Sequence, residues 1–173
     1  MKTLTLSEID EKRKHGLRPQ VVGCFVHEQK VFLFYDKKHH LWQFPQGGIE
    51  NLEETEAALV REMSEELGAR FVEQKKNCQL LVEDRINFPE KYWGSRPLRT
   101  DEGEKVLMKG KHYYAFAIET EAPSIILQET QFDDYLLASY EQAESLLVKV
   151  YQKEKRRIAV RFLEALVSKK LIA

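Results

Sequence analysis

The stretch that decides the fold covers residues 47–69 and reads GGIENLEETEAALVREMSEELGA. Its second half is rich in Ala, Leu and Glu, which favour a helix, and Gly68 stands where a helix would stop. Acidic residues gather near the expected helix start, where they complement the helix dipole. The pattern predicts an α-helix from Thr55 to Leu67, preceded by a tight Gly-Gly turn.

Three acidic side chains of this helix, Glu62, Glu65 and Glu66, fall within about 100° of one another around the helix axis. Neighbouring carboxylates repel by a few tenths of a kcal/mol per pair, and a hard divalent cation such as Mg²⁺ would relieve that repulsion. A solvated acidic helix face is the common alternative for such a pattern. A different face carries apolar residues suited to packing on a sheet, namely Val60, Met63 and Leu67.

The spacing resembles the signature of Nudix hydrolases, G-x5-E-x7-R-E-U-x-E-E-x-G-U, where U is a bulky aliphatic residue. Ala69 at the last position is smaller than is usual in that family. The matching residues are Gly47, Glu53, Arg61, Glu62, Met63, Glu65, Glu66 and Gly68.

This resemblance implies an α/β domain in which a mixed β-sheet is sandwiched between helices, an α/β/α Nudix fold. It implies metal-dependent hydrolysis of a nucleoside diphosphate linked to another moiety, with Mg²⁺ as cofactor and Mn²⁺ as a substitute. The expected metal ligands are Glu62, Glu65 and Glu66, together with the backbone carbonyl of Gln46 or Gly47.

The catalytic residues expected from the resemblance are Glu65 or Glu66 as proton acceptor, with Arg61 and Glu53 as an ion pair. That pair would order the loop against the helix. The alternative for Arg61 and Glu53 is a surface pair that contributes under about 1 kcal/mol.

A longer match indicates which group within this family the chain resembles. Residues 41–49 read LWQFPQGGI and resemble a segment of bacterial RNA pyrophosphohydrolases and their dinucleoside polyphosphate hydrolase relatives. Residues 16–19 read GLRP and resemble the GYRP of that group, in which the Arg lies near substrate phosphate. The basic residues Lys153 and 155–157 also fall in a basic region of that group, although a solvated helix face is the favoured explanation for them. The expected substrate-binding residues are Arg18, Gln43, Gln46, Gly48, Tyr92, Trp93 and Gln131.

Aromatic residues offer stacking surfaces for a nucleobase. Tyr92 and Trp93 stand in a polar segment and are the better candidates for substrate contact. For Trp42, Tyr113 and Tyr114, a place in the hydrophobic core is the expected alternative.

One position departs from these relatives, which usually read P-E-F-D where this chain has Thr130, Gln131 and Phe132 before Asp133. A glutamine neither takes up a proton nor offers a charged metal ligand. Either Glu129 or Asp133 replaces the missing carboxylate, or fewer metal ions bind, or the activity is reduced.

The rest of the chain alternates strand-like and helix-like segments. Residues 1–15 are expected to form a polar N-terminal helical extension, capped by Ser7, and residues 16–173 the Nudix domain. A long polar loop is expected at residues 89–105. The predicted strands are 21–26, 31–35, 41–44, 80–88, 106–118 (interrupted around residues 109–111) and 125–127, and the further predicted helices are 140–148 and 152–168.

Composition fits one domain: 173 residues, 43% of them hydrophobic, with a net charge of −1. Such a balance gives no global field for DNA or for an anionic membrane, so neither is expected as a stable partner. The N-terminus lacks a signal-peptide pattern, and no apolar run approaches the ~18 residues that span a bilayer, which predicts a cytoplasmic protein. Cys24 and Cys78 form no CxxC pair, and Cys24 is expected to be a buried reduced thiol. The sequence predicts no particular oligomeric state.

Three functions follow as hypotheses. The first is hydrolysis of 5′-triphosphate RNA ends or of dinucleoside polyphosphates. The second is housecleaning hydrolysis of nucleoside triphosphates or nucleotide sugars. The third is a non-catalytic nucleotide-sensing module, which Gln131 favours mildly and the complete glutamate set disfavours.

Overall fold

The computed structural model describes residues 3–173, so Met1 and Lys2 of the expected extension lie outside the described residues. Its centre is a seven-stranded mixed sheet with the path β3-β2-β1-β8-β5, in which β4 also pairs with β1 and β9 with β2. Only β1 and β8 run parallel; the other pairs are antiparallel. The strands are β1 (Leu17–His27), β2 (Lys30–Asp36), β3 (Leu41–Gln43), β4 (Gln46–Gly48), β5 (Lys75–Asn87), β8 (Gly110–Thr120) and β9 (Asp134–Ala138).

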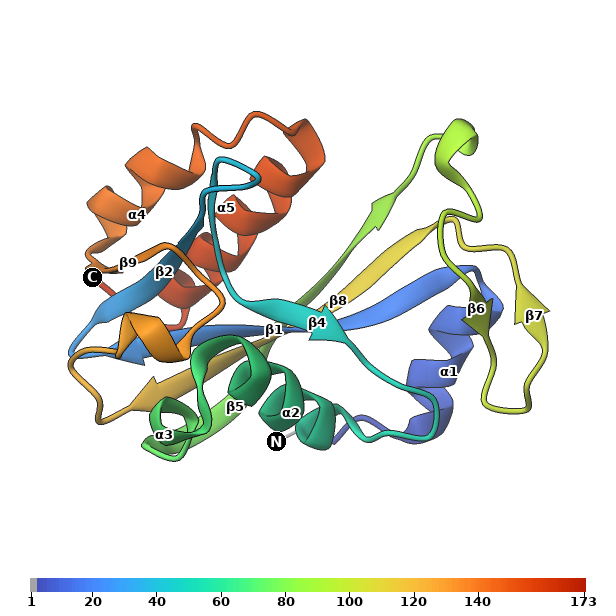
Figure 1. Ribbon diagram of the computed structural model, residues 1–173, viewed down its shortest axis with the longest axis horizontal. Helices are drawn as coiled ribbons and strands as arrows, with labels where there is room; N and C mark the ends of the chain where they lie inside the picture. Colours follow the sequence, from blue (N-terminus) through green and yellow to red (C-terminus); the bar gives the residue numbers. More distant parts are fainter. Residues whose placement is uncertain (1–2) are drawn as a thin grey trace.

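Helices cover both faces of this sheet, as predicted (Figure 1). Helices α2 (Thr55–Leu67) and α3 (Ala69–Val72) lie on one side, and α4 (Tyr140–Leu147) and α5 (Lys153–Ser168) on the other. Each face has its own hydrophobic cluster, with α2 packed into one and α5 into the other. Within residues 3–173, no helix is long and apolar enough to cross a membrane.

Strand β1 shows how one sheet serves two cores. Val22 and Cys24 belong to the cluster under α5, whereas Val21 and Phe25 belong to the cluster under α2. Successive side chains on a strand point to opposite faces, so a strand covered on both sides is apolar throughout. The prediction that Cys24 is a buried free thiol is confirmed, and burial raises its pKa.

Several predicted elements need correction. Residues 125–127 form no strand; Leu127–Glu129 is a short 3-10 turn, η2. Strand β9 was not predicted, because its sequence alternates weakly and it depends on pairing with the distant β2. In α2, Val60 is 41% exposed, and the residues that pack on the sheet are Ala58, Leu59, Met63 and Leu67.

The segment between β5 and β8 also differs from the simple loop predicted there. It contains a 3-10 turn, η1 (Glu90–Tyr92), and a small hairpin of β6 (Leu98–Arg99) and β7 (Lys105–Val106). The predicted strand 106–118 is interrupted, as expected, but at residues 107–109: residue 106 ends β7, and β8 begins at Gly110. The hairpin projects beyond the main sheet, next to the N-terminal helix (Figure 1).

The N-terminal helix α1 (Leu6–Lys14) forms as predicted, but its packing differs from that of an appendage. Its N-cap is Thr5 rather than Ser7, in a capping box with Glu8. Ile9 is only 1% exposed and belongs to the cluster under α2. The helix is therefore part of the folded body.

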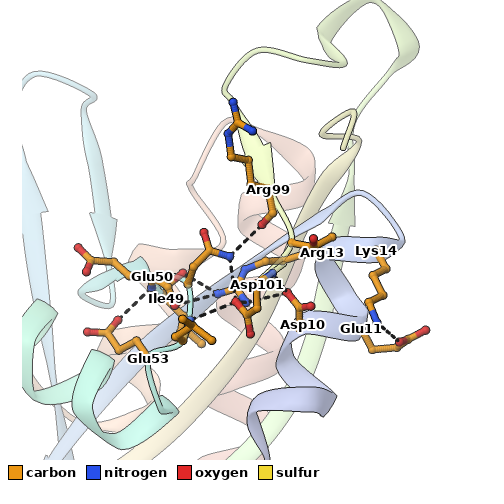
Figure 2. A network of polar contacts seen from close by, with 12 residues as sticks. Asp10, Glu11, Arg13, Lys14, Ile49, Glu50, Glu53, Arg99 and Asp101 are labelled. Atoms are coloured by element: carbon orange, nitrogen blue, oxygen red, sulfur yellow. Dashed lines mark hydrogen bonds and ion pairs between the residues drawn. The ribbon is translucent and has the colours of Figure 1, made fainter. Parts of the chain in front are cut away.

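Arg13 fastens α1 to the loop that precedes α2 (Figure 2). Its Nη2 donates to the carbonyl oxygens of Ile49 and Glu50, at 3.1 and 3.0 Å. Its Nη1 donates to the carboxylates of Asp10 and Asp101, at 3.2 and 3.0 Å. Because Arg13 is 2% exposed, these bonds are shielded from water and hold three segments of the chain together.

Replacing Arg13 with methionine should therefore destabilise the protein by about 3–5 kcal/mol, because two carboxylates near it would lose their cation inside the protein. The free energy of unfolding in urea measures this loss. The matched control is Lys14→Met, one residue along, where a half-exposed lysine makes one 3.9 Å ion pair and a change within about 0.5 kcal/mol is expected. Equal stability of the two variants would mean that α1 is only loosely attached.

Candidate functional site

A cleft of about 510 Å³ opens beside the glycine turn, lined by residues of β1, β3, β4, α2, β8 and α5. The first half of the motif forms β4 and the loop after it, and the second half forms α2. The cleft has an acidic wall from α2 and a basic wall from other elements. The acidic wall depends on contacts that hold the loop against the helix.

Arg61 is the centre of those contacts. Its Nε and Nη2 donate to the two carboxylate oxygens of Glu53, at 2.8 and 2.9 Å, so the predicted ion pair is present and bidentate. The same Nη2 donates to the Gly48 carbonyl at 2.9 Å, and Nη1 donates to Glu62 at 2.7 Å. The Glu53 side chain is 15% exposed, so this is not the exposed surface pair of the alternative.

The pKa values of both partners reflect this pairing. The hydrogen bonds to Glu53 raise the pKa of Arg61, and Glu62 adds to the rise. The hydrogen bonds from Arg61 lower the pKa of Glu53. Arg61 therefore stays charged and holds the loop, the turn and the acidic wall together.

The acidic wall consists of Glu62 and Glu66, which line the cleft, whereas the Glu65 side chain is 56% exposed and does not. Burial raises the pKa of Glu66 to about 8, and the carboxylates of Glu62 and Glu65 add to the rise. Its Oε2 accepts a hydrogen bond from the Gln46 backbone N–H at 3.2 Å. The predicted stripe of three glutamates is thus divided between the cleft and the solvent.

Position 47 requires a glycine because the backbone there passes very close to the acidic wall. A Cβ atom at this position would lie 2.0 Å from Oε2 of Glu62, far inside any permitted contact. Only glycine lets the backbone of β4 come so near the carboxylate. The backbone oxygens of the turn and the Glu62 carboxylate consequently lie in the same small region.

The residues of the acidic wall supply only part of the coordination shell of a magnesium ion. Among residues 3–173, no three histidine, cysteine, aspartate or glutamate side chains lie close enough together to hold a metal. Magnesium, however, commonly takes one or two carboxylates and completes its shell with water and substrate phosphates. Glu62 and Glu66 meet that lower requirement, and the buried Glu66 carboxyl would ionise more readily beside a cation.

Four cations form the basic wall: Arg18, Arg96, Lys111 and Lys155. Burial, together with the charges of Arg96, Lys155 and Arg18, lowers the pKa of Lys111 to about 8. Burial and Arg96 likewise lower the pKa of Arg18. In the described part of the chain, none of the four takes part in an ion pair. Cations that lie close together and form no ion pair have the charge that would complement a polyanion.

Of these cations, sequence reasoning singled out Arg18 and included Lys155 in a basic group. Arg18 packs on the glycine turn, since a Cβ on Gly48 would lie 2.8 Å from its Nη2. Sequence reasoning missed Lys111, which faces the cleft with Arg18 because the two are register partners on β8 and β1. Arg96 stands in the irregular segment after β5 and carried no local signal.

The structure brings most of the expected substrate-binding residues to the cleft, but two lie elsewhere. Tyr92 and Trp93 do not line it; Trp93 borders a different cavity. Trp42, which had a core alternative, does line the cleft, and its ring centroid lies 5.3 Å from that of Tyr35. The expected residues that line the cleft are Arg18, Gln43, Gln46, Gly48 and Gln131.

The two carboxylates that stood as replacements at the Gln131 position are engaged elsewhere. Glu129 lies 3.6 Å from Arg70 in an ion pair, and Asp133 accepts the backbone N–H of Lys37 at 2.8 Å. Neither lines the cleft. The further carboxylate that does so is Asp36, which sequence reasoning missed.

Asp36 reaches the cleft from the end of β2. It accepts a hydrogen bond from the His39 ring at 2.5 Å, and this bond, despite the opposing effect of burial, leaves the pKa of Asp36 lowered. His39 also lines the cleft. The acidic side of the cleft therefore includes a third carboxylate that the motif does not contain.

Comparison with known proteins agrees with this architecture. The NUDIX domain family matches residues 17–162. The chain is 29% identical to an RNA pyrophosphohydrolase of Aliivibrio fischeri over 162 residues, covering 84% of this chain and 87% of that protein. It is 31% identical to an RNA pyrophosphohydrolase of Photobacterium profundum over 136 residues, covering 72% of this chain and 71% of that protein.

Solved structures share the fold at low identity. The E. coli dihydroneopterin triphosphate pyrophosphohydrolase superposes with a TM-score of 0.58 at 14% identity, covering 86% of this chain and 97% of that one. A C. elegans Ap4A hydrolase gives 0.54 at 15% identity, with 87% and 98% covered. A NUDIX domain from Shewanella oneidensis, solved with ADP ribose, gives 0.54 at 15%, with 89% and 88% covered.

The Arg61 contacts predict that Arg61→Lys destabilises the protein by about 1.5–3 kcal/mol, because a lysine cannot reproduce the fork that binds both oxygens of Glu53. Chemical denaturation gives the free energy of unfolding. Arg70→Lys is the matched control, since Arg70 is 70% exposed and makes one 3.6 Å ion pair. That control should change stability by no more than about 0.5 kcal/mol. Equal losses of stability in both variants would show that the bidentate contact of Arg61 contributes no more than an exposed ion pair.

Proposed function

The chain belongs to the NUDIX family of hydrolases, and from that premise we propose that it cleaves a phosphoanhydride bond with the help of Mg²⁺. The proposed substrates are 5′-triphosphate RNA ends and dinucleoside polyphosphates. The proposal retains the cytoplasmic location expected from the sequence, where such substrates occur. It requires no membrane and no stable DNA partner, and it leaves the oligomeric state open.

One observation carries the proposal: a carboxylate wall and a wall of unpaired cations face the same cleft. Glu62 and Glu66 contribute the first, and Arg18 and Lys111 lie within the second. A polyphosphate chain with a divalent cation complements both walls, because its oxygens suit the cations and its metal suits the carboxylates. Neither a neutral ligand nor a simple anion would complement both.

In the proposed mechanism, Arg18 and Lys111 bind phosphate oxygens and hold the scissile bond near the α2 carboxylates. Glu62 and Glu66, with the carbonyl of Gln46 or Gly47, would hold Mg²⁺, and Mn²⁺ is the expected substitute. When bound, such an ion neutralises phosphate charge and lowers the pKa of the attacking water.

Proton transfer completes the proposed reaction. Water attacks phosphorus, the bridging P–O bond breaks, and a carboxylate accepts the water proton. Of the two expected bases, Glu66 lines the cleft whereas the Glu65 side chain is 56% exposed, so Glu66 is the better placed proton acceptor. Arg61 acts indirectly, by fixing Glu62 and the turn.

The choice of RNA ends over free nucleotides has a narrower basis. The two curated relatives at 29% and 31% identity are RNA pyrophosphohydrolases, and each aligns over more than two thirds of its own length. The structural neighbours with smaller substrates are 14% and 15% identical and support the fold alone. Housecleaning of nucleoside triphosphates or nucleotide sugars therefore remains the second candidate, and a non-catalytic sensor is disfavoured by the intact Glu62 and Glu66.

The proposal is tested by phosphate or pyrophosphate release from triphosphate-ended RNA, diadenosine tetraphosphate, nucleoside triphosphates and nucleotide sugars, with Mg²⁺ or Mn²⁺. We expect the first two to be cleaved fastest and chelation by EDTA to abolish the reaction. Glu66→Gln should lower kcat at least about 100-fold, the loss of several kcal/mol of charge stabilisation. Glu56→Gln, on the exposed start of the same helix, is the control and should retain full activity. Full activity of Glu66→Gln would eliminate the proposed site.

The Gln131 position gives a second prediction. Gln131 lines the cleft, and its backbone N–H donates to the Glu66 carbonyl at 2.8 Å, so a carboxylate placed there would reach the same region. Gln131→Glu should raise kcat about tenfold if a missing proton acceptor or ligand limits the rate. Gln128→Glu adds the same charge on η2 outside the cleft lining and should leave kcat unchanged. An unaltered rate in Gln131→Glu would indicate that Asp36 or Glu66 already fills the role.

A further inference from the structure

A second cavity, of about 690 Å³, lies at the end of the sheet next to α1, outside the cleft already described. Figure 1 shows the ends of β1, β5 and β8 reaching past α2 and α5 toward α1 and the segment that carries η1, β6 and β7. The residues that carry the argument are Lys12, Arg85, Trp93, Lys109 and His112, all of which line it.

The lining of this cavity carries an excess of positive charge. Lys12, Arg85 and Lys109 form no ion pair within residues 3–173. The cavity also contains acidic residues, but these have partners. Asp84 lies 3.0 Å from Arg157 and 2.9 Å from Arg161, and Glu11 lies near Lys14 and His15. The free charges in the cavity are therefore those of the three cations.

Trp93 adds an aromatic surface beside these cations. Its indole N–H donates to the Phe88 carbonyl at 3.0 Å, which fixes the ring, and the residue remains 37% exposed. The Lys109 ammonium lies 5.1 Å from the ring centroid. The cation lies over the indole ring, so an aromatic surface and a positive charge that suits a phosphate are held at one place, the combination found where bases stack and phosphates bind.

His112 leaves polar capacity unused in the same cavity. The residue is 8% exposed, and its Nε2 is bonded to Glu83 at 2.9 Å. Its Nδ1 has no hydrogen-bond partner among the described residues. Buried polar atoms are normally satisfied, so this nitrogen at the wall of the cavity is an exception within the described residues.

The same strands, and the same segment after β5, contribute residues to both the cavity and the cleft. Arg18 and Lys111 are register partners that line the cleft, whereas the next residues, Leu17 and His112, line the cavity. Side chains alternate across a sheet, so the two sites occupy opposite faces of the same strand ends. In the segment after β5, Arg96 lines the cleft and Trp93 the cavity.

We propose that this cavity binds the single-stranded RNA that follows a 5′ end held in the cleft. The bases stack on Trp93, and Lys109, Arg85 and Lys12 bind the phosphates. The inference rests on the proposed function for which end of the RNA occupies the cleft. It also explains why Trp93 lies away from the cleft in a chain whose relatives act on RNA. A free nucleotide fits the same chemistry but would occupy only one of the two sites.

The test uses a 5′-hydroxyl RNA of about ten nucleotides, within the footprint of single-strand binding surfaces, labelled for fluorescence anisotropy. Trp93→Ala should weaken binding about tenfold, the effect of losing one stacked base. Tyr151→Ala, which removes a 78% exposed aromatic outside both sites, is the matched control and should bind normally. Thermal unfolding of each variant checks that it is folded.

Lys109→Gln gives a second, less disruptive variant. It should weaken the same binding and reduce the slope of log K against log salt by about 0.7, the value for one phosphate contact on a single strand. Its hydrolysis of diadenosine tetraphosphate should stay at the wild-type rate, since Lys109 does not line the cleft.

Two results would overturn the inference: no binding of 5′-hydroxyl RNA by the wild type, or equal binding by Trp93→Ala and Tyr151→Ala. Displacement of the RNA by an equal concentration of adenosine monophosphate would also overturn it in favour of a nucleotide pocket. Because this RNA has no phosphoanhydride bond, the binding result stands whether or not the protein hydrolyses any substrate. A failure of the proposed function is therefore seen separately, in the substrate panel.

Discussion

The guanidinium of Arg61 connects three parts of the molecule. It binds both oxygens of Glu53 in the loop, the Gly48 carbonyl in the turn and the carboxylate of Glu62 on its own helix. Arg13 holds the same loop from the other side, through the carbonyls at residues 49 and 50. A loop fastened by two partly or fully buried arginines can hold its carbonyl groups in one geometry, which a metal or phosphate site requires.

Charges of like sign lie close together on each wall of the cleft. On one wall, burial and neighbouring carboxylates raise the pKa of Glu66; on the other, burial and neighbouring cations lower the pKa of Lys111. Each wall carries like charges that disfavour their ionised forms, and each would be relieved by a ligand of opposite charge. Such mutual repulsion costs stability in the free protein, so it is typical of a binding site and unlike the neutralised pairs elsewhere on the surface.

The central parallel pair of strands distributes these features over the two faces of the sheet. Alternate residues of β1 and β8 line the cleft on one face and meet α1 on the other. Parallel strands buried on both sides have little freedom to shift, because a slip of one residue would exchange every side chain between faces. The positions of Arg18 and Lys111 relative to α2 are consequently fixed by the core rather than by the loops.

The sequence by itself determined the features that depend on short spacing. These are the helix from Thr55 to Leu67, the nearness of Glu62 and Glu66, and the family signature, because helical geometry fixes which residues share a face. The tertiary structure alone decided which distant groups join them: Lys111, Arg96 and Asp36 reach the cleft, Glu65 and Trp93 do not, and α1 belongs to the body. Those outcomes rest on strand register, two-sided packing and contacts between residues far apart in the chain, for which no local pattern carries a signal.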